Sequence, residues 1–285
     1  MSKAKTGPEL IEISNNMAVA KATAPWYKLV ILGILGGAFI AFAAQGSTMA
    51  AYNLLADPAT FGLGRALKGA LFTVGLILVI VAGAELFTGN VLMTTGVLCK
   101  RISRPSLLRN WGIVYAANMG GAVLIAMLIH ASGLWGSSED LLGAMVIKMA
   151  AGKTALGFQS AFVLGILCNW LVCLGVWMAW SAESVGGKMA AAFFPILLFI
   201  TSGFEHSIAN MYYIPAGMMA KGVPEYVAKA AEVGVSAEAL AGLNLHGFFV
   251  VNLIPVTLGN IVGAAAFIAC AYVFAYRPKG GALGS

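Results

Sequence analysis

Six long apolar segments are the feature that most constrains this chain. They cover residues 26–55, 65–98, 109–134, 155–181, 188–220 and 245–276 of the 285-residue sequence. A helix needs roughly 20 apolar residues to cross the ~30 Å hydrocarbon core of a bilayer. Only 10% of the residues are charged, whereas a soluble domain carries about a quarter. The sequence therefore predicts an all-α membrane protein with six transmembrane helices.

Two of these segments, 65–98 and 188–220, are too long to be single straight spans. At roughly 1.5 Å per residue, each would extend about 50 Å as one helix, well beyond the hydrocarbon thickness. Both also carry polar residues and glycine near the middle. Irregular backbone inside a membrane is tolerated where it lines a cavity. We therefore expect the second and fifth helices to be broken near the middle of the bilayer.

Three motifs recur in the same order in the two halves of the chain. GAELFTGN at 83–90 matches GFEHSIAN at 203–210, and LGIL occurs at 32–35 and again at 164–167. The third motif, N-x-x-G-A, begins at Asn118 and at Asn260. These matches pair the first three spans with the last three. Because three is an odd number, the two halves enter the membrane from opposite sides, which predicts an inverted three-plus-three repeat.

The basic residues predict how the chain is oriented. With six spans, 11 of the 17 lysines and arginines fall on one side, and the other six are matched by six acids. An excess of basic residues marks the cytoplasmic side, so both termini are expected in the cytoplasm. We expect one transmembrane domain with an N-terminal segment (1–25), a pore domain (26–276) and a tail (277–285). Nucleic acid is not an expected partner, because the basic residues flank apolar spans and form no stripe.

An acid and a histidine stand side by side in the expected break of the fifth segment. Glu205 has a counterpart in Glu85, and Asn210 has one in Asn90. This repetition favours support of the helix breaks over a direct role of these four residues in function. His206 is not repeated, because the other half has leucine at this position. Histidine has an unperturbed pKa of about 6.5, so a functional role in proton exchange or hydrogen bonding is favoured for His206.

For five further residues the sequence leaves a structural and a functional role open. Thr88 can cap freed backbone in the first break or contact a permeant ion, and Lys153 can be a loop lysine or attract anions to a vestibule. Phe72, Leu76 and Phe199 precede the breaks on the long spans. Their pattern alone favours core or lipid-facing packing, and a hydrophobic gate is the alternative. The starts of the half-helices after each break would also attract anions through their free N–H groups.

An enzymatic function is not expected from the motifs. The chain has three histidines, and none lies in an HExxH motif or near a carboxylate at metal-ligand spacing. There is no GxSxG motif and no phosphate-binding loop in the sequence. Neither a metal nor a cofactor is therefore predicted.

Four longer motifs resemble a known family. These are GAELFTGNVL (83–92), LGILCNWLVCLGVWMA (164–179), SGFEHSIANMYYIPAGM (202–218) and NLIPVTLGNIVGA (252–264). Together they resemble the formate/nitrite transporter family across all six spans. The resemblance implies an aquaporin-like hourglass fold with broken second and fifth helices. It also implies a homo-pentamer in the bacterial inner membrane, in which each protomer surrounds its own pore.

The resemblance also assigns roles to individual residues. The family's central histidine falls on His206, its break-loop threonine on Thr88 and its vestibule lysine on Lys153. Its apolar constrictions fall on Phe72, Leu76 and Phe199. We therefore expect the passage of small anions of weak acids, with a proton gained near His206 at the apolar gate. Formate is the expected substrate, with nitrite or hydrosulfide as alternatives, and a proton-coupled secondary transporter would use the same residues. A non-transporting anchor or sensor would show no flux.

Overall fold

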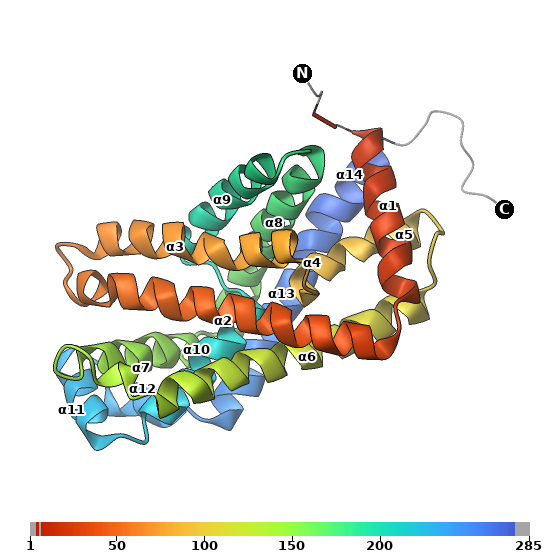
Figure 1. The fold of residues 1–285 in the computed structure, drawn as a ribbon. Coiled ribbons are helices and arrows are strands. Elements are labelled where there is room, and N and C mark those ends of the chain that lie inside the picture. The colour runs from red at the N-terminus through yellow and green to blue at the C-terminus, as the bar shows by residue number, and fades with distance from the viewer. Residues whose placement is uncertain (1–3, 6, 277–285) are drawn as a thin grey trace.

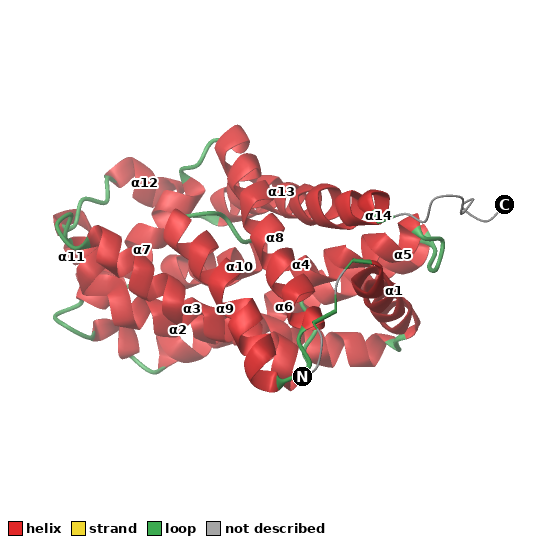
Figure 2. Ribbon diagram, turned by 90° about the horizontal axis from the view of Figure 1, so that it is seen from above, coloured by secondary structure: helices red, strands yellow, loops and turns green. Residues whose placement is uncertain are grey.

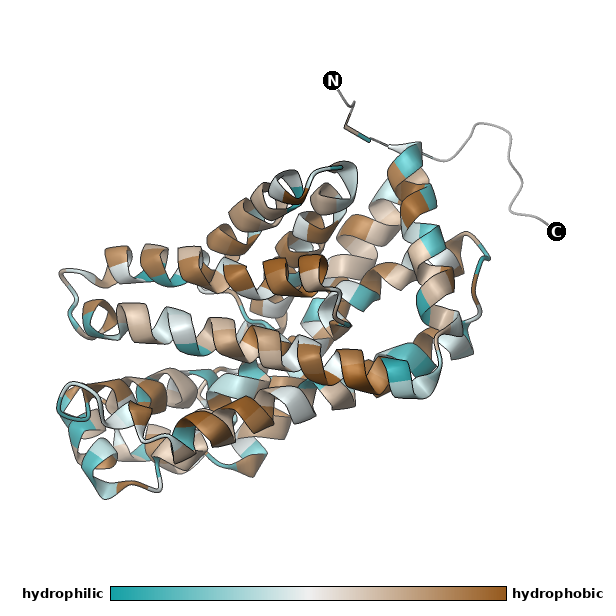
Figure 3. Cartoon of the chain, in the orientation of Figure 1, coloured by the Kyte–Doolittle hydropathy of each residue, from teal (hydrophilic) through white to brown (hydrophobic). Residues whose placement is uncertain are grey.

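The computed structural model describes residues 4–5 and 7–276, and in this part of the chain it contains helices and no strand. Among these described residues, six helical stretches are long and apolar enough to cross a membrane, in agreement with the prediction. They are α2 (Trp26–Ala56), α3 (Phe61–Ala82), α6 (Arg104–Ala131), α8 (Phe158–Ser181), α9 (Val185–Ser202) and the continuous stretch Gly247–Ala275. The last stretch comprises η3 (Gly247–Leu253), α13 (Ile254–Ala264), η4 (Ala265–Cys270) and α14 (Ala271–Ala275). Apolar residues follow α2, α3 and α6 over most of their length (Figure 3).

The second and fifth spans are broken, as the segment lengths predicted. An extended stretch, 83–86, follows α3, and the chain continues in short helices. These are α4 (Phe87–Asn90), η1 (Val91–Met93) and α5 (Thr94–Leu98). The stretch 203–206 follows α9 in the same way and leads into α10 (Ser207–Ala220). Both long helices end at a left-handed glycine, Gly83 with φ 82° and Gly203 with φ 84°, a conformation that glycine adopts without a steric penalty.

The two halves run in opposite directions through the molecule. Figure 1 shows α1, α5 and α14 at one end, here called the α1 end, and α7, α11 and α12 at the other, the α7 end. Helix α2 begins at the α1 end, whereas α8 finishes there, where Lys5 N–H donates to the Ser181 carbonyl oxygen at 3.3 Å. A Cβ atom at Gly121 would collide with the Ile34 carbonyl, and one at Gly263 would collide with the matching carbonyl of Ile166. The inverted repeat is thus visible in helix direction and in close helix packing.

The repeat includes an extra helix in each half, which the hydropathy pattern did not predict. α1 (Pro8–Thr23) lies in the part expected as an N-terminal segment, and α7 (Leu141–Thr154) lies where a polar connection was expected. The remaining short helices are η2 (Leu134–Gly136), α11 (Pro224–Glu232) and α12 (Ala237–Gly242). With 14 residues, α7 extends about 21 Å, so it is too short to register as a span although most of it is buried. The expected tail, 277–285, lies outside the described residues.

The helices pack as two groups around the broken spans. α2 packs against α3 and α6, and α8 packs against α9 and α13. Seen from above, α13 and α14 form one continuous rod beside α8 (Figure 2). Helix α3 of the first half also packs against α9 of the second half. This contact places the two breaks next to each other in the interior.

Candidate functional site

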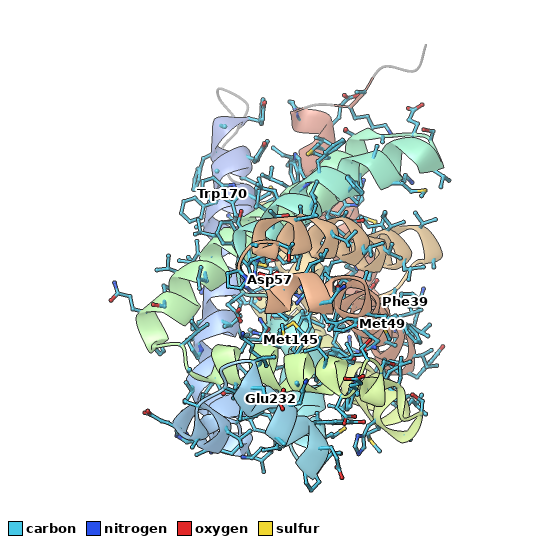
Figure 4. The ribbon with its side chains drawn as sticks, turned by 90° about the vertical axis from the view of Figure 1, so that its left-hand side faces the viewer. Phe39, Met49, Asp57, Met145, Trp170 and Glu232 are labelled. Carbon is cyan, nitrogen blue, oxygen red and sulfur yellow. The ribbon has the colours of Figure 1, made fainter. Side chains whose placement is uncertain are left out.

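Two cavities lie on opposite sides of the breaks. The first, of about 340 Å³, is at the α1 end, and its charged lining residues are Lys21, Lys28 and Glu85. The second, of about 360 Å³, is at the α7 end. Its charged lining residues are Arg65, Lys68, Lys148, Lys153 and Glu205. Figure 4 faces the α7 end, with Met145 of the second cavity near the middle of the view. Two cavities around a closed centre give the expected hourglass form.

A buried apolar layer separates the cavities. Phe72 of α3 and Phe199 of α9 meet edge to face, with ring centroids 5.9 Å apart, and they are 2% and 1% exposed. Phe72 lies one helical turn after Lys68, which lines the second cavity. Leu76, one turn further along α3, is 2% exposed and lines the first cavity. The three residues of the predicted constriction are thus brought together between the two cavities. An anion crossing this layer would have to give up its hydration.

The two breaks meet at a polar contact within this layer. The Thr88 hydroxyl oxygen lies 2.9 Å from Nε2 of His206, and both side chains are buried. Nδ1 of the same imidazole accepts a hydrogen bond from the Ala209 N–H at 3.1 Å. A ring nitrogen that accepts a hydrogen bond carries no proton, so the proton of the imidazole is on Nε2, which donates a hydrogen bond to the Thr88 hydroxyl oxygen. The ring centroids of Phe199 and His206 are 6.0 Å apart, which places this contact beside the aromatic constriction.

Glu205 is held by side chains around the second break. Its Oε1 lies 2.7 Å from the Lys153 ammonium, and its Oε2 accepts from the Asn210 amide at 2.7 Å. Asn252 connects the group, because its Oδ1 accepts from Asn210 at 2.7 Å and its Nδ2 donates to the Lys153 carbonyl at 3.0 Å. The carboxylate is therefore neutralised by a lysine that also lines the second cavity. The charge of Lys153 is in turn largely offset by Glu205.

The first half repeats this arrangement with the corresponding residues. Glu85 Oε1 lies 2.7 Å from the Lys21 ammonium, and Oε2 accepts from the Asn90 amide at 2.6 Å. Asn90 donates to Asn110 at 2.8 Å, and Asn110 donates to the Lys21 carbonyl at 3.3 Å. Each break thus has one lysine, one glutamate and two asparagines in the same pattern. An arrangement that occurs twice supports the interpretation of Glu85, Glu205, Asn90 and Asn210 as stabilising the breaks.

A further asparagine holds the backbone of each break. Asn118 accepts from the Phe87 N–H at 2.9 Å and donates to the carbonyls of Gly33 and Glu85 at 2.7 and 2.9 Å. Its counterpart Asn260 accepts from Ser207 N–H and donates to the matching two carbonyls at 2.8 and 2.9 Å. These bonds pair the first N–H group of each half-helix. Fewer N–H groups therefore face the centre than the sequence predicted.

The sequence did not reveal every residue of these clusters. Lys21 lies in the expected N-terminal segment (1–25), yet it occupies the position of Lys153 in the first half. Both lysines stand 11 residues before the repeated LGIL motif, a signal that could have paired them. Asn110 and Asn252 have a similar signal, because both stand eight residues before the repeated N-x-x-G-A motif. Lys148 also has a partner from a distant segment, since its ammonium donates to the Val233 carbonyl at 2.7 Å.

Both the sequence and the fold match known membrane channels and transporters. A profile described as formate/nitrite transporter matches residues 8–274. The chain belongs to the formate/nitrite transporter family. It is accordingly a multi-pass membrane protein of a transport family, and the earlier resemblance is confirmed over nearly the whole chain.

Relatives of this family member cover almost all of its length. A probable formate transporter of Methanothermobacter thermautotrophicus is 37% identical, over 96% of this chain and 98% of that protein. The formate channel FocA of Haemophilus influenzae is 38% identical, over 94% of this chain and 93% of that protein. A solved structure of a pentameric formate channel with formate bound matches with a TM-score of 0.74 and 35% identity. That match covers 88% of this chain and 97% of the other.

Proposed function

We propose that this transporter-family member is a channel for formate, with a proton transferred near His206. The observation that carries the proposal is the contact between Thr88 and His206, enclosed between two cavities by Phe72, Leu76 and Phe199. Relatives over nearly the full length of the chain are named as a probable formate transporter and a formate channel, which supports formate over nitrite or hydrosulfide.

The apolar layer explains why a proton is needed for the anion to cross. Moving a carboxylate without compensation into an apolar environment is strongly unfavourable, whereas neutral formic acid avoids most of this cost. The anion enters a cavity with a basic lining, meets the buried Thr88–His206 pair and gains a proton there. It then passes the rings of Phe72 and Phe199 as the neutral acid. Proton gain at the centre therefore couples formate movement to pH.

The geometry limits which group gives the proton. Nδ1 of His206 is an acceptor and Nε2 donates to Thr88, so the imidazole is neutral in this arrangement. A neutral imidazole is too weak an acid to protonate formate, so His206 must first take up a proton from water at Nδ1, releasing the Ala209 N–H. It can then give its Nε2 proton to the anion and return to the neutral form. Glu205 is a poor donor, because both of its carboxylate oxygens are already occupied. The assignment of His206 as the exchange point is therefore favoured over Glu205.

The assembly and the orientation complete the proposal. The structural relative is described as a pentamer, which supports a homo-pentamer in which each protomer carries its own pathway. The basic residues Lys100, Arg101 and Arg104 follow α5 at the α1 end, so this end should face the cytoplasm from an inner membrane. Because α1 brings Lys21 to the first cavity, we extend the pore domain from 26–276 to include α1.

Replacement of the histidine tests the proposal. We expect His206→Phe to abolish proton-linked formate uptake into proteoliposomes while the protein still elutes from a sizing column as the wild type does. The aromatic ring fills the space of the imidazole but can neither accept nor donate a proton. His130→Phe is a matched control, because His130 lies at the end of α6 away from the cavities. Wild-type uptake with an unchanged pH dependence in His206→Phe would contradict the proposal.

A further inference from the structure

A buried lysine in the second cavity has no anionic partner. Lys68 lies on α3, within a membrane span, and is 8% exposed. Its ammonium lies 3.0 Å from the Met149 sulfur and 4.5 Å from the centre of the Tyr213 ring. In the described part of the chain, its ammonium has no oxygen partner. A thioether is a weak acceptor, so this three-donor group keeps hydrogen-bonding capacity unused.

The other basic residues of this cavity are already engaged. Lys153 pairs with Glu205, and Lys148 donates to the Val233 carbonyl. Arg65 donates to the carbonyls of Ile200 and Thr201 at 2.7 and 3.2 Å, at the end of α9. Among the described residues, Lys68 is therefore the positive group of the second cavity that has no oxygen acceptor. An unpaired ammonium inside a membrane protein is costly unless an anion or a cavity compensates it.

Two positive groups share one aromatic neighbour in this cavity. The Lys153 ammonium lies 5.3 Å from the centre of the Tyr213 ring, which also lies 4.5 Å from Lys68. The two nitrogen atoms are therefore no more than about 10 Å apart. An anion bound to Lys68 also lies one helical turn from Phe72, at the entrance to the constriction. This position is where an anion would wait before it loses its water.

The first cavity has no equivalent of Lys68. The repeat places Lys188 at the matching position, 120 residues later and four residues before the counterpart of Phe72. Lys188 does not line the first cavity. Of the two lysines that do, Lys21 is paired with Glu85, and Lys28 is exposed, whereas Lys68 is buried. The charge of the two cavities therefore differs although the scaffold around them is repeated.

We propose that Lys68 is an anion-binding residue that holds a small monovalent carboxylate in the second cavity before it enters the constriction. This inference rests on the proposed function, because it concerns how the transported anion is captured. It adds that capture is stronger at the α7 end than at the α1 end. Formate entering from the α7 end should consequently reach half-saturation at a lower concentration than formate entering from the α1 end.

Transport measured from both sides tests the inference. Each variant would be expressed in a host without its own formate channel, and right-side-out and inverted membrane vesicles would be prepared from these cells. The entry of labelled formate would then be followed over a range of concentrations. We expect Lys68→Met to raise the half-saturating concentration from the α7 end by about tenfold, as the loss of one charged hydrogen bond implies. Entry from the α1 end should keep its concentration dependence. Lys68→Arg keeps the positive charge and should bring the half-saturating concentration from the α7 end most of the way back to the wild-type value.

The matched control is Lys188→Met, which removes a lysine at the repeated position outside the cavity. It should leave the concentration dependence from both sides unchanged. If wild-type vesicles admit formate and Lys68→Met keeps the wild-type concentration dependence at the α7 end, the inference is wrong and the proposed function stands. If wild-type vesicles admit no formate, the proposed function is wrong as well.

A measurement on the wild type guards against a variant that fails to fold. Lysines of the purified protein would be methylated with formaldehyde and a mild reductant, with and without formate, and quantified by mass spectrometry. We expect formate to slow methylation of Lys68 several-fold while Lys188 is unaffected. Equal methylation of Lys68 with and without formate would overturn the inference.

Discussion

The two halves of the protein build the same scaffold from different directions, yet they bring different chemistry to the centre. Each half has a Lys–Glu pair, a ladder of asparagines and a left-handed glycine at its break. The central residues are not shared: His206 matches Leu86, and Thr88 matches Ile208. The polar contact between the breaks therefore takes one residue from each half. Residues that occur in both halves hold the backbone, whereas the residues proposed to act on the anion occur in one half only.

The largest effect should come from the repeated scaffold. We expect Asn118→Ala and Asn260→Ala each to lower the unfolding free energy in detergent micelles by about 4 kcal/mol. Each substitution leaves two buried backbone groups of the break unpaired, the first N–H of the half-helix and the carbonyl of Glu85 or Glu205, at roughly 1–3 kcal/mol per group. Because the two hydrogen-bond networks match, the two losses of unfolding free energy should agree within about 1 kcal/mol.

Asn53→Ala serves as the control for this comparison. Its side chain accepts only the neighbouring Leu54 N–H at an exposed position, so its loss should stay within about 0.5 kcal/mol. A large effect of Asn260→Ala with little effect of Asn118→Ala would show that the halves do not share a scaffold in energetic terms.

A smaller effect should come from the unshared centre. Thr88→Val removes the hydroxyl that accepts from His206 and should lower formate flux about tenfold, since a hydrogen bond in a buried site contributes about 1.5 kcal/mol. Ile208→Val changes the matching position of the other half, where only packing is altered, and should leave flux within about threefold of the wild type. If Thr88→Val and Ile208→Val lost the same amount of formate flux, Thr88 would have no special role at the centre. Flux into proteoliposomes at a fixed pH is the measurement.

The smallest effect should come from the lysines of the ion pairs. Lys153→Ala leaves the Glu205 carboxylate unpaired beside the second cavity, so anion entry from the α7 end should need a roughly threefold higher formate concentration. Lys21→Ala should have the same effect from the α1 end, through Glu85. The double variant Lys153→Ala with Glu205→Gln removes both charges and should return close to the wild type. An unchanged concentration dependence in Lys153→Ala would count against its role in anion recruitment.

The broad architecture follows from local properties of the sequence. Six spans and two breaks could be predicted because segment length and hydropathy are limited by bilayer thickness. The inversion followed from the order of three short motifs. His206 stood out for the same reason, since it interrupts an otherwise repeated motif. These features need no knowledge of which helices touch.

The missed features depend on contacts between distant segments. α7 is buried by α10, yet its 14 residues are too few to be recognised as a span. The partnership of Lys21 with Glu85 joins residues 64 apart, and Lys68 is significant only because Tyr213 and Met149 surround it. Hydropathy counts both lysines as basic residues near a span. Their roles appear only when the helices are assembled.

Simultaneous measurement of formate and proton movement tests the central claim most directly. Wild-type protein in proteoliposomes that enclose a pH-sensitive dye would be given an inward formate gradient without a membrane potential. We expect one proton to enter with each formate, and the coupling to be lost with the flux in His206→Phe. Formate entry through the wild type without an accompanying change in internal pH would contradict the role of His206 in proton transfer.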